Sequence, residues 1–89
     1  MYNQIMYYYT YVLISRKDGK LYTGFTHRLR ERLNEHNNGL NRSTKGRGPF
    51  DLIYYEACLS EEMAIKREKQ LKSGHGKRYI KNRLGAPYF

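Results

Sequence analysis

The chain has 89 residues, enough for one small domain with a thin hydrophobic core. Its single cysteine, Cys58, excludes an internal disulfide, and no apolar run reaches the roughly 18 residues that a membrane-spanning helix needs. A net charge of +9 attracts polyanions, nucleic acid above all, although simple solvation or attraction to a membrane surface would also suit such a surface. The start of the chain lacks a signal-peptide pattern, so we expect a cytoplasmic protein.

The first half of the chain predicts a β-hairpin followed by a helix. Residues 1–5 carry no pattern and are expected to be disordered. Residues 6–14 and 21–25 are rich in aromatic and β-branched side chains, which favour strands. Asp18-Gly19 between them suits a tight two-residue turn. Thr26 then offers an N-cap for a helix that Gly39 ends.

The second half predicts a loop, a strand and two helices. Residues 40–49 mix glycine and proline with basic and hydroxyl residues, which indicates a mobile loop. Residues 50–57 form a third strand-like run. Ser60 is expected to cap a helix that has acids in its first turn and lysines in its last, and Gly74 to end it. Residues 76–84 predict a short basic helix, so the element order is ββαβαα without an internal repeat.

Ionisable side chains interrupt the apolar stripes of the first two predicted helices. The stripes are Leu29, Arg32, Leu33, His36 on the first helix and Ala64, Glu68, Leu71 on the second. Buried charges are costly unless they are paired or bound to metal. Two helices that both direct ionisable groups inward therefore indicate a site between them. The alternative is an Arg32–Glu68 ion pair that closes a thin core.

Two tyrosines on the predicted hairpin could belong to the same site. Tyr11 and Tyr22 project from one face of the sheet if the hairpin loop has an even number of residues. The two-residue turn would offset them by about four residues, roughly 13 Å along the strands, so they would flank a site without touching. A wider loop would bring them closer. Core packing alone would also explain two tyrosines on one face.

The order of these residues resembles the GIY-YIG nuclease domain. Tyr11, the triplet Tyr22-Thr23-Gly24, Arg32 and His36 on one helix, and Glu68 on a later helix follow the family's motif residues. The segments YTYVL, LYTGFT, RLNEH and REKQLK are similar to small stand-alone bacterial members, which are related to the incision domain of the excinuclease C subunit. The sequence departs from the motif at Tyr9-Thr10-Tyr11, where the family has Gly-Ile-Tyr, and at Thr23. The family's late asparagine has Asn82 as its only candidate here.

The resemblance implies an α+β fold with a small three-stranded antiparallel sheet flanked by helices. It also implies a metal-dependent endonuclease that acts on DNA in repair or recombination and is directed by structure rather than by sequence. Glu68 would hold a divalent metal, Mg²⁺, and Arg32 would bind the scissile phosphate. Tyr11 or Tyr22, as a phenolate, would accept the proton of the attacking water, and His36 would relay that proton or orient a tyrosine.

Six basic residues are the candidates for non-specific phosphate contacts. They are Arg42, Lys45, Arg47, Lys77, Arg78 and Lys81. A non-catalytic nucleic-acid-binding module with the same fold, or a basic protein of ribosomal type, is the alternative to the nuclease. A Cys58 nucleophile and a zinc site built on the histidines have no support from residue spacing.

Overall fold

The computed structural model describes residues 5–85 and contains three strands and three helices in the predicted order. Their bounds are β1 Tyr8–Ser15, β2 Leu21–Thr26, α1 Leu29–Asn37, β3 Phe50–Cys58, α2 Glu61–Lys72 and α3 Gly74–Leu84. The predicted disorder at the start of the chain lies, apart from Ile5, outside the described residues. The α+β fold class is confirmed.

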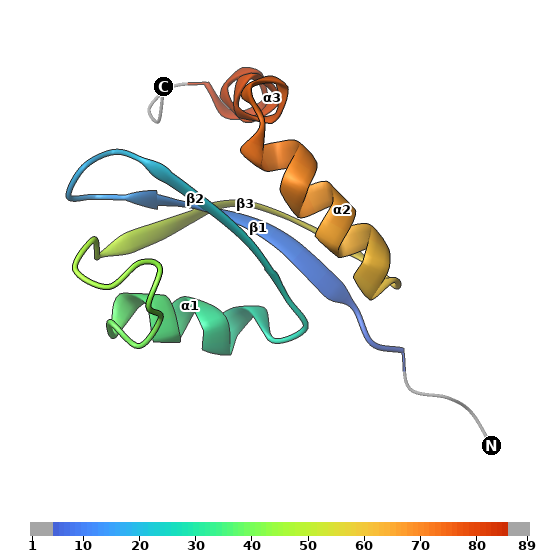
Figure 1. Ribbon diagram of the computed structural model, residues 1–89, viewed down its shortest axis with the longest axis horizontal. Helices are drawn as coiled ribbons and strands as arrows, with labels where there is room; N and C mark the ends of the chain where they lie inside the picture. Colours follow the sequence, from blue (N-terminus) through green and yellow to red (C-terminus); the bar gives the residue numbers. More distant parts are fainter. Residues whose placement is uncertain (1–4, 86–89) are drawn as a thin grey trace.

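The three strands form one antiparallel sheet in the order β2-β1-β3. Figure 1 shows α1 below this sheet and α2 with α3 above it. Side chains alternate along a strand, so β1 supplies both faces. Tyr11 and Leu13 pack with α1 and Phe50, whereas Val12 packs with Leu71 of α2 and with α3. The central strand therefore belongs to two separate core clusters.

The hairpin connection differs from the predicted two-residue turn. Residues 16–20 join the strands, and the Ser15 amide donates to the Lys20 carbonyl at 3.0 Å. The Ser15 hydroxyl accepts from the amides of Lys17 at 3.1 Å and Asp18 at 3.2 Å, which opens the loop. Gly19 has a φ of 70°, as the Asp-Gly pattern predicts, but it lies in this wider loop. The loop was mispredicted because sequence patterns did not reveal the turn built on Ser15.

Helix starts and ends follow the predicted chemistry with two corrections. Ser60 caps α2, since its hydroxyl accepts from the Met63 amide at 3.2 Å. Thr26 does not cap α1; it accepts from the Arg28 amide at 3.0 Å, and α1 begins only at Leu29. Residue 73, rather than Gly74, ends α2, because the Ser73 hydroxyl donates to the last turn and accepts from the first turn of α3.

The segment between α1 and β3, residues 38–49, is docked on the hairpin by hydrogen bonds that the composition did not predict. The Asn37 side chain accepts from the Phe50 amide at 2.7 Å and donates to the Phe50 carbonyl at 3.3 Å. The Ser15 hydroxyl donates to the Arg47 carbonyl at 2.6 Å, and the Arg16 amide donates to Pro49 at 2.9 Å. These bonds satisfy backbone groups that composition alone would leave to water. We refer to residues 38–49 below as the docked loop.

Candidate active site

Two tyrosines and a histidine meet on the α1 face of the sheet. The Tyr11 hydroxyl lies 2.9 Å from His36 Nε2, within hydrogen-bond distance. Tyr22 lies opposite Leu13 and Tyr11 lies opposite Gly24, so the tyrosines are offset by two residues instead of four. Their ring centroids are 6.4 Å apart, and the Tyr22 centroid is 4.9 Å from that of His36. The wider hairpin loop thus brings together residues that the tight turn would have separated.

Gly24 is required by the position of Tyr11. A Cβ atom added at Gly24 would lie 2.5 Å from the Tyr11 hydroxyl and 2.7 Å from the adjoining ring carbon. The phenol of Tyr11 therefore lies over the main chain of β2, where any larger residue would force the ring to shift. The glycine of the Tyr-Thr-Gly triplet is therefore explained by its steric contact with Tyr11. The same contact fixes the direction of the Tyr11 ring.

Thr44 completes the surroundings of His36, and the sequence did not reveal it. Its hydroxyl lies 2.7 Å from His36 Nδ1, and the residue has no exposed surface. Thr44 belongs to the docked loop, where its amide donates to the Asn41 carbonyl and its carbonyl accepts from the Arg47 amide. A threonine among glycines and basic residues gives no sequence signal of burial, because loops are usually exposed.

Arg32 and Glu68 approach Tyr11 from different helices. The prediction of a site between two facing helices is wrong, because the sheet separates α1 from α2. The predicted alternative, an Arg32–Glu68 ion pair, is also absent among the described residues. Arg32 pairs with Glu35 at 3.0 Å, and Glu68 lies 3.5 Å from Lys72. The charges of Arg32 and Glu68 instead both act on the pKa of Tyr11, that of Glu68 most weakly.

Burial controls the protonation of the two central groups. Burial raises the pKa of Tyr11; Tyr22 and Glu68 add to the rise, and the Arg32 guanidinium opposes it. Burial also lowers the pKa of His36, and the positive charge of Arg32 acts in the same direction. At neutral pH the pair therefore consists of a phenol and an uncharged imidazole. Any role of Tyr11 as a base requires additional positive charge beside it.

α2 is attached to β1 next to Tyr11. The Thr10 hydroxyl donates to the Ala64 carbonyl at 3.0 Å, and both residues are buried. Glu68 follows Ala64 by one helical turn and so lies on the same face of α2. Its side chain is 16% exposed. A mostly buried carboxylate at the margin of an open surface is suited to a cation.

Among residues 5–85, no group of three or more His, Cys, Asp and Glu side chains lies close enough to hold a metal ion. Asn82, the candidate for the family's late asparagine, is exposed on α3. Cys58 is half-buried, and its thiol donates to the Ser60 carbonyl at 3.2 Å, which is a structural role.

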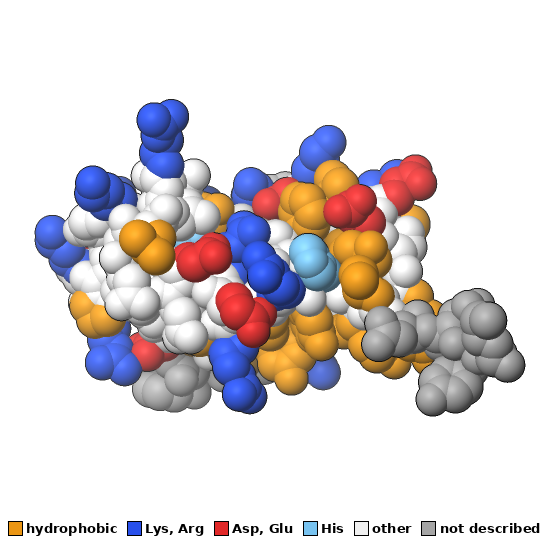
Figure 2. Space-filling view, turned by 90° about the horizontal axis from the view of Figure 1, so that it is seen from below, with side chains coloured by type: hydrophobic (Ala, Val, Ile, Leu, Met, Phe, Trp, Pro, Cys, Tyr) orange, Lys and Arg blue, Asp and Glu red, His pale blue; other side chains and the backbone are white. Residues whose placement is uncertain are grey.

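The basic residues gather at the end of the molecule that carries the hairpin loop and the docked loop. Figure 2 shows Lys and Arg side chains clustered there on the α1 side. A groove of about 970 Å³ runs between the hairpin loop and α3, and its basic lining residues are Lys20, Arg47, Lys77 and Lys81. Arg47 is half-buried, pairs with Asp18 at 3.3 Å and lies over the Phe50 ring. Arg42, Lys45 and Arg78 are exposed.

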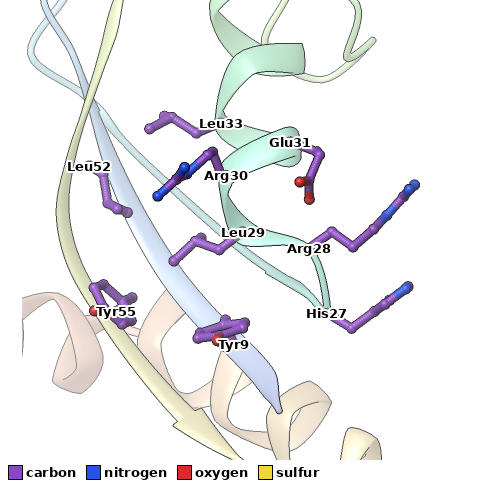
Figure 3. Close-up of a pocket in the computed structure, with 9 residues that line it drawn as sticks. All are labelled: Tyr9, His27, Arg28, Leu29, Arg30, Glu31, Leu33, Leu52 and Tyr55. Atoms are coloured by element: carbon purple, nitrogen blue, oxygen red, sulfur yellow. The ribbon is translucent and has the colours of Figure 1, made fainter. Parts of the chain in front are cut away.

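A second cleft, of about 620 Å³, lies between α1 and the strands. Figure 3 shows Leu29 and Arg30 of α1 facing Leu52 of β3, with Tyr9 and Tyr55 at one end and Glu31 directed away. Tyr9 shares a strand face with Tyr11, so the cleft lies beside the candidate site and does not contain it. Tyr11 and His36 of the candidate site are each 1% exposed, so these two groups lie beneath the surface between β1 and α1.

No helix within residues 5–85 is long and apolar enough to span a membrane.

Comparison with known proteins agrees with this fold. The family model of the GIY-YIG catalytic domain matches residues 7–82. A UPF0213 protein from Clostridium perfringens is 43% identical over 65 residues, covering 72% of this chain and 69% of the relative. The solution NMR structure of a UPF0213 protein from Bacillus halodurans has a TM-score of 0.57 at 36% identity, covering 93% of this chain and 90% of that chain. The chain belongs to the GIY-YIG family of nuclease domains.

Proposed function

We propose that this protein is a metal-dependent endonuclease that hydrolyses phosphodiester bonds in DNA, directed by DNA structure rather than sequence, in repair or recombination. The observation that supports it most is the Tyr11–His36 hydrogen bond of 2.9 Å at a phenol on which the charges of Arg32 and Glu68 both act. Ionisable groups whose pKa values are shifted by burial and by neighbouring charges occur most often at functional sites, which supports this assignment.

The residues divide the tasks of hydrolysis among them. A water oxygen attacks phosphorus as the water loses a proton, the bond to the leaving oxygen breaks, and that oxygen departs as an alkoxide that takes a proton from solvent. Arg32 has planar donors that suit two phosphate oxygens, and its pairing with Glu35 is partly exposed, so the guanidinium can exchange partners. Tyr11, once deprotonated, accepts the water's proton. Tyr22 lies against His36 and closes the other side of the imidazole.

Glu68 would hold the metal, and Mg²⁺ suits it because this ion binds few protein ligands and keeps several waters. When bound, the ion supplies positive charge to the phosphate and to the surroundings of Tyr11. Lys72, 3.5 Å from Glu68 and with its side chain 54% exposed, already occupies the place of a cation and can swing into solvent. This ion pair supports the proposal, because it pairs the Glu68 carboxylate with a positive charge.

Glu68→Gln tests the enzymatic proposal. Purified protein is incubated with branched, flapped and linear DNA in Mg²⁺ or in EDTA, and the products are resolved on gels. We expect wild type to cut in Mg²⁺ only and Glu68→Gln to lose about 10²-fold or more of the rate, the scale typical for removing one charge-stabilising group. Glu62→Gln is the matched control, because Glu62 lies exposed on the same helix.

Equal cleavage by wild type and Glu68→Gln on every DNA would refute the metal role of Glu68. Tight DNA binding by wild type with no cleavage in Mg²⁺ would favour the alternative, a nucleic-acid-binding module that retains the nuclease fold. The groove with Lys20, Lys77 and Lys81 supports DNA binding in either case.

A further inference from the structure

The cleft between α1 and the strands contains aromatic and basic side chains that the proposed reaction does not use. We propose that this cleft binds an unpaired nucleobase of the DNA substrate, and that Tyr9, Tyr55 and Arg30 contact the base. This inference rests on the proposed function, because it names the part of the DNA that the protein holds away from the cut. The preferred substrate therefore carries an unpaired segment, as a flap or a single strand does.

The cleft has the size and the floor that a base requires. Its volume is about 620 Å³, within the range of about 300–1,000 Å³ that is typical of small-molecule sites. Leu29, Leu33 and Leu52 contribute apolar surface, and Figure 3 shows Tyr9 and Tyr55 at one end. A base that enters the cleft thus moves its ring from water onto apolar side chains, which is favourable.

The two tyrosines leave aromatic surface uncovered. The ring centroids of Tyr9 and Tyr55 lie 5.9 Å apart with 62° between the ring planes, which is an edge-to-face contact. Such a contact covers one face of one ring, and Tyr55 remains 54% exposed. Neither hydroxyl has a hydrogen-bond partner among residues 5–85, so both can bond to the polar edge of a base.

Arg30 supplies a charge that favours a nucleotide over an apolar ligand or a protein segment. Figure 3 shows its side chain directed into the cleft, toward Leu52, whereas Glu31 is directed away. In the part of the chain that the structure describes, the Arg30 guanidinium has no ion-pair or hydrogen-bond partner. A guanidinium is planar and weakly hydrated, so it can stack on a base or bind a phosphate. An apolar partner would leave this charge without a counter-charge.

The cleft and the reacting groups lie on two sides of α1. Arg30 and Arg32 flank the leucine stripe of α1 from opposite sides, because successive helical residues are about 100° apart. Both sides face the same surface of the sheet, since Tyr55 pairs directly with Tyr11 between β3 and β1. A strand cut beside Arg32 therefore passes α1, about 10 Å across, before one of its bases reaches the cleft. An unpaired strand can turn a base into the cleft at the lowest cost.

Binding to an abasic oligonucleotide isolates the contribution of the bases. A labelled oligothymidine and an abasic oligonucleotide of the same length carry the same phosphates, and EDTA prevents metal-dependent cleavage during the measurement. By fluorescence anisotropy, wild type should bind oligothymidine about tenfold more tightly, which is the scale of one stacked base. Tyr55→Leu removes the ring and should bring the two affinities close together, and Tyr55→Phe should keep most of the difference. Tyr79→Leu is the matched control, because Tyr79 is 41% exposed and lines a different cleft.

The location of the base is measured on wild type, so it does not depend on the folding of a variant. In ¹H–¹³C correlation spectra, the ring signals of Tyr9 and Tyr55 should shift with oligothymidine and stay in place with the abasic oligonucleotide. Shifts at other tyrosines alone, or equal affinity of wild type for both oligonucleotides, would overturn the proposal. A dimer of the free protein that Tyr55→Leu dissociates in sedimentation experiments would assign the cleft to a second copy of the chain instead.

Cleavage of flapped DNA separates this proposal from the proposed function. Tyr55→Leu should raise KM about tenfold and leave kcat unchanged, because the cleft holds a base away from the reacting atoms. Wild type that cuts flapped DNA but binds both oligonucleotides equally would refute the base-binding cleft and leave the nuclease intact. Wild type that cuts no DNA but prefers oligothymidine would refute the nuclease, while the cleft would keep its assignment.

Discussion

Gly24 illustrates how closely individual residues are fitted at this site. The atom that any other residue would add at this position falls on the Tyr11 hydroxyl. The phenol of Tyr11 thus packs directly on the main chain of β2. The motif triplet is accordingly a packing requirement as well as a family signature, and Thr23 can replace the family's isoleucine because it lies on the other face of β2.

Gly24→Ala should displace the Tyr11 ring and reduce cleavage with a modest loss of stability. Overpacking typically costs about 1–3 kcal/mol, and a shift of a catalytic group by about 1 Å can cost about 10²-fold in rate. Cleavage rates and thermal melts measure the two effects separately. Gly74→Ala is the control, because a Cβ atom there meets nothing within 4 Å. Normal cleavage by Gly24→Ala would show that the Tyr11 position is not critical.

The burial of individual residues could be predicted where they lie on a helix, because the helical periodicity of the sequence indicates which side chains face inward. Arg32, His36 and Glu68 stood out because each occupies an apolar stripe, and the structure places them half-buried or buried. Thr44 could not be found this way, since a loop has no periodicity from which burial follows. Its neighbour His36 was identified, but the sequence does not say which residue faces the second ring nitrogen.

At the scale of elements, capping chemistry was predictable and the hairpin register was not. Ser60 stands before two acids and an apolar stripe, and it caps α2 as expected. The hairpin register depends on the hydrogen bonds of the Ser15 hydroxyl. One of them is a tertiary contact, because this hydroxyl donates to the Arg47 carbonyl of the docked loop. The same register fixes the distance between Tyr22 and Tyr11.

Ser60→Ala should lower the free energy of unfolding by about 1 kcal/mol, because the Met63 amide loses its cap. Urea denaturation followed by circular dichroism measures this loss, and Ser43→Ala gives the baseline for an exposed serine. Cleavage per folded molecule should stay near wild type, since Glu68 lies well inside α2. An unchanged denaturation midpoint would mean that water replaces the cap.

At the scale of the whole molecule, the sheet separates the helices that supply the site. Arg32 and His36 lie on α1 and Glu68 lies on α2, on opposite faces. Element order alone does not determine which sheet face a helix covers, so the sequence predicted two facing helices where the structure has the sheet between them. Only the three-dimensional structure shows that the charges of Arg32 and Glu68 both act on Tyr11.

The excess positive charge should make DNA binding depend steeply on salt. Each phosphate contact contributes about 0.9 to the slope of log K against log salt concentration. Lys77→Ala, in the groove beside the hairpin loop, should reduce the slope by about that amount. Lys66→Ala, an exposed lysine on α2 that lines a different cleft, should leave it nearly unchanged. Equal slopes for both variants, measured by fluorescence anisotropy, would remove the groove from the DNA interface.

The hydrogen bond from the Thr10 hydroxyl to the Ala64 carbonyl fixes the position of α2 on β1, and with it the position of Glu68 relative to Tyr11. Thr10 and Tyr11 are adjacent on β1, and one holds α2 while the other reaches toward α1. A slide of α2 along the sheet by one residue, about 1.5 Å, would break this bond and move Glu68 by the same distance. The distance between the Glu68 carboxylate and the Tyr11 phenol is thereby set by Thr10 and Tyr11, two adjacent residues of β1, and not by either helix alone.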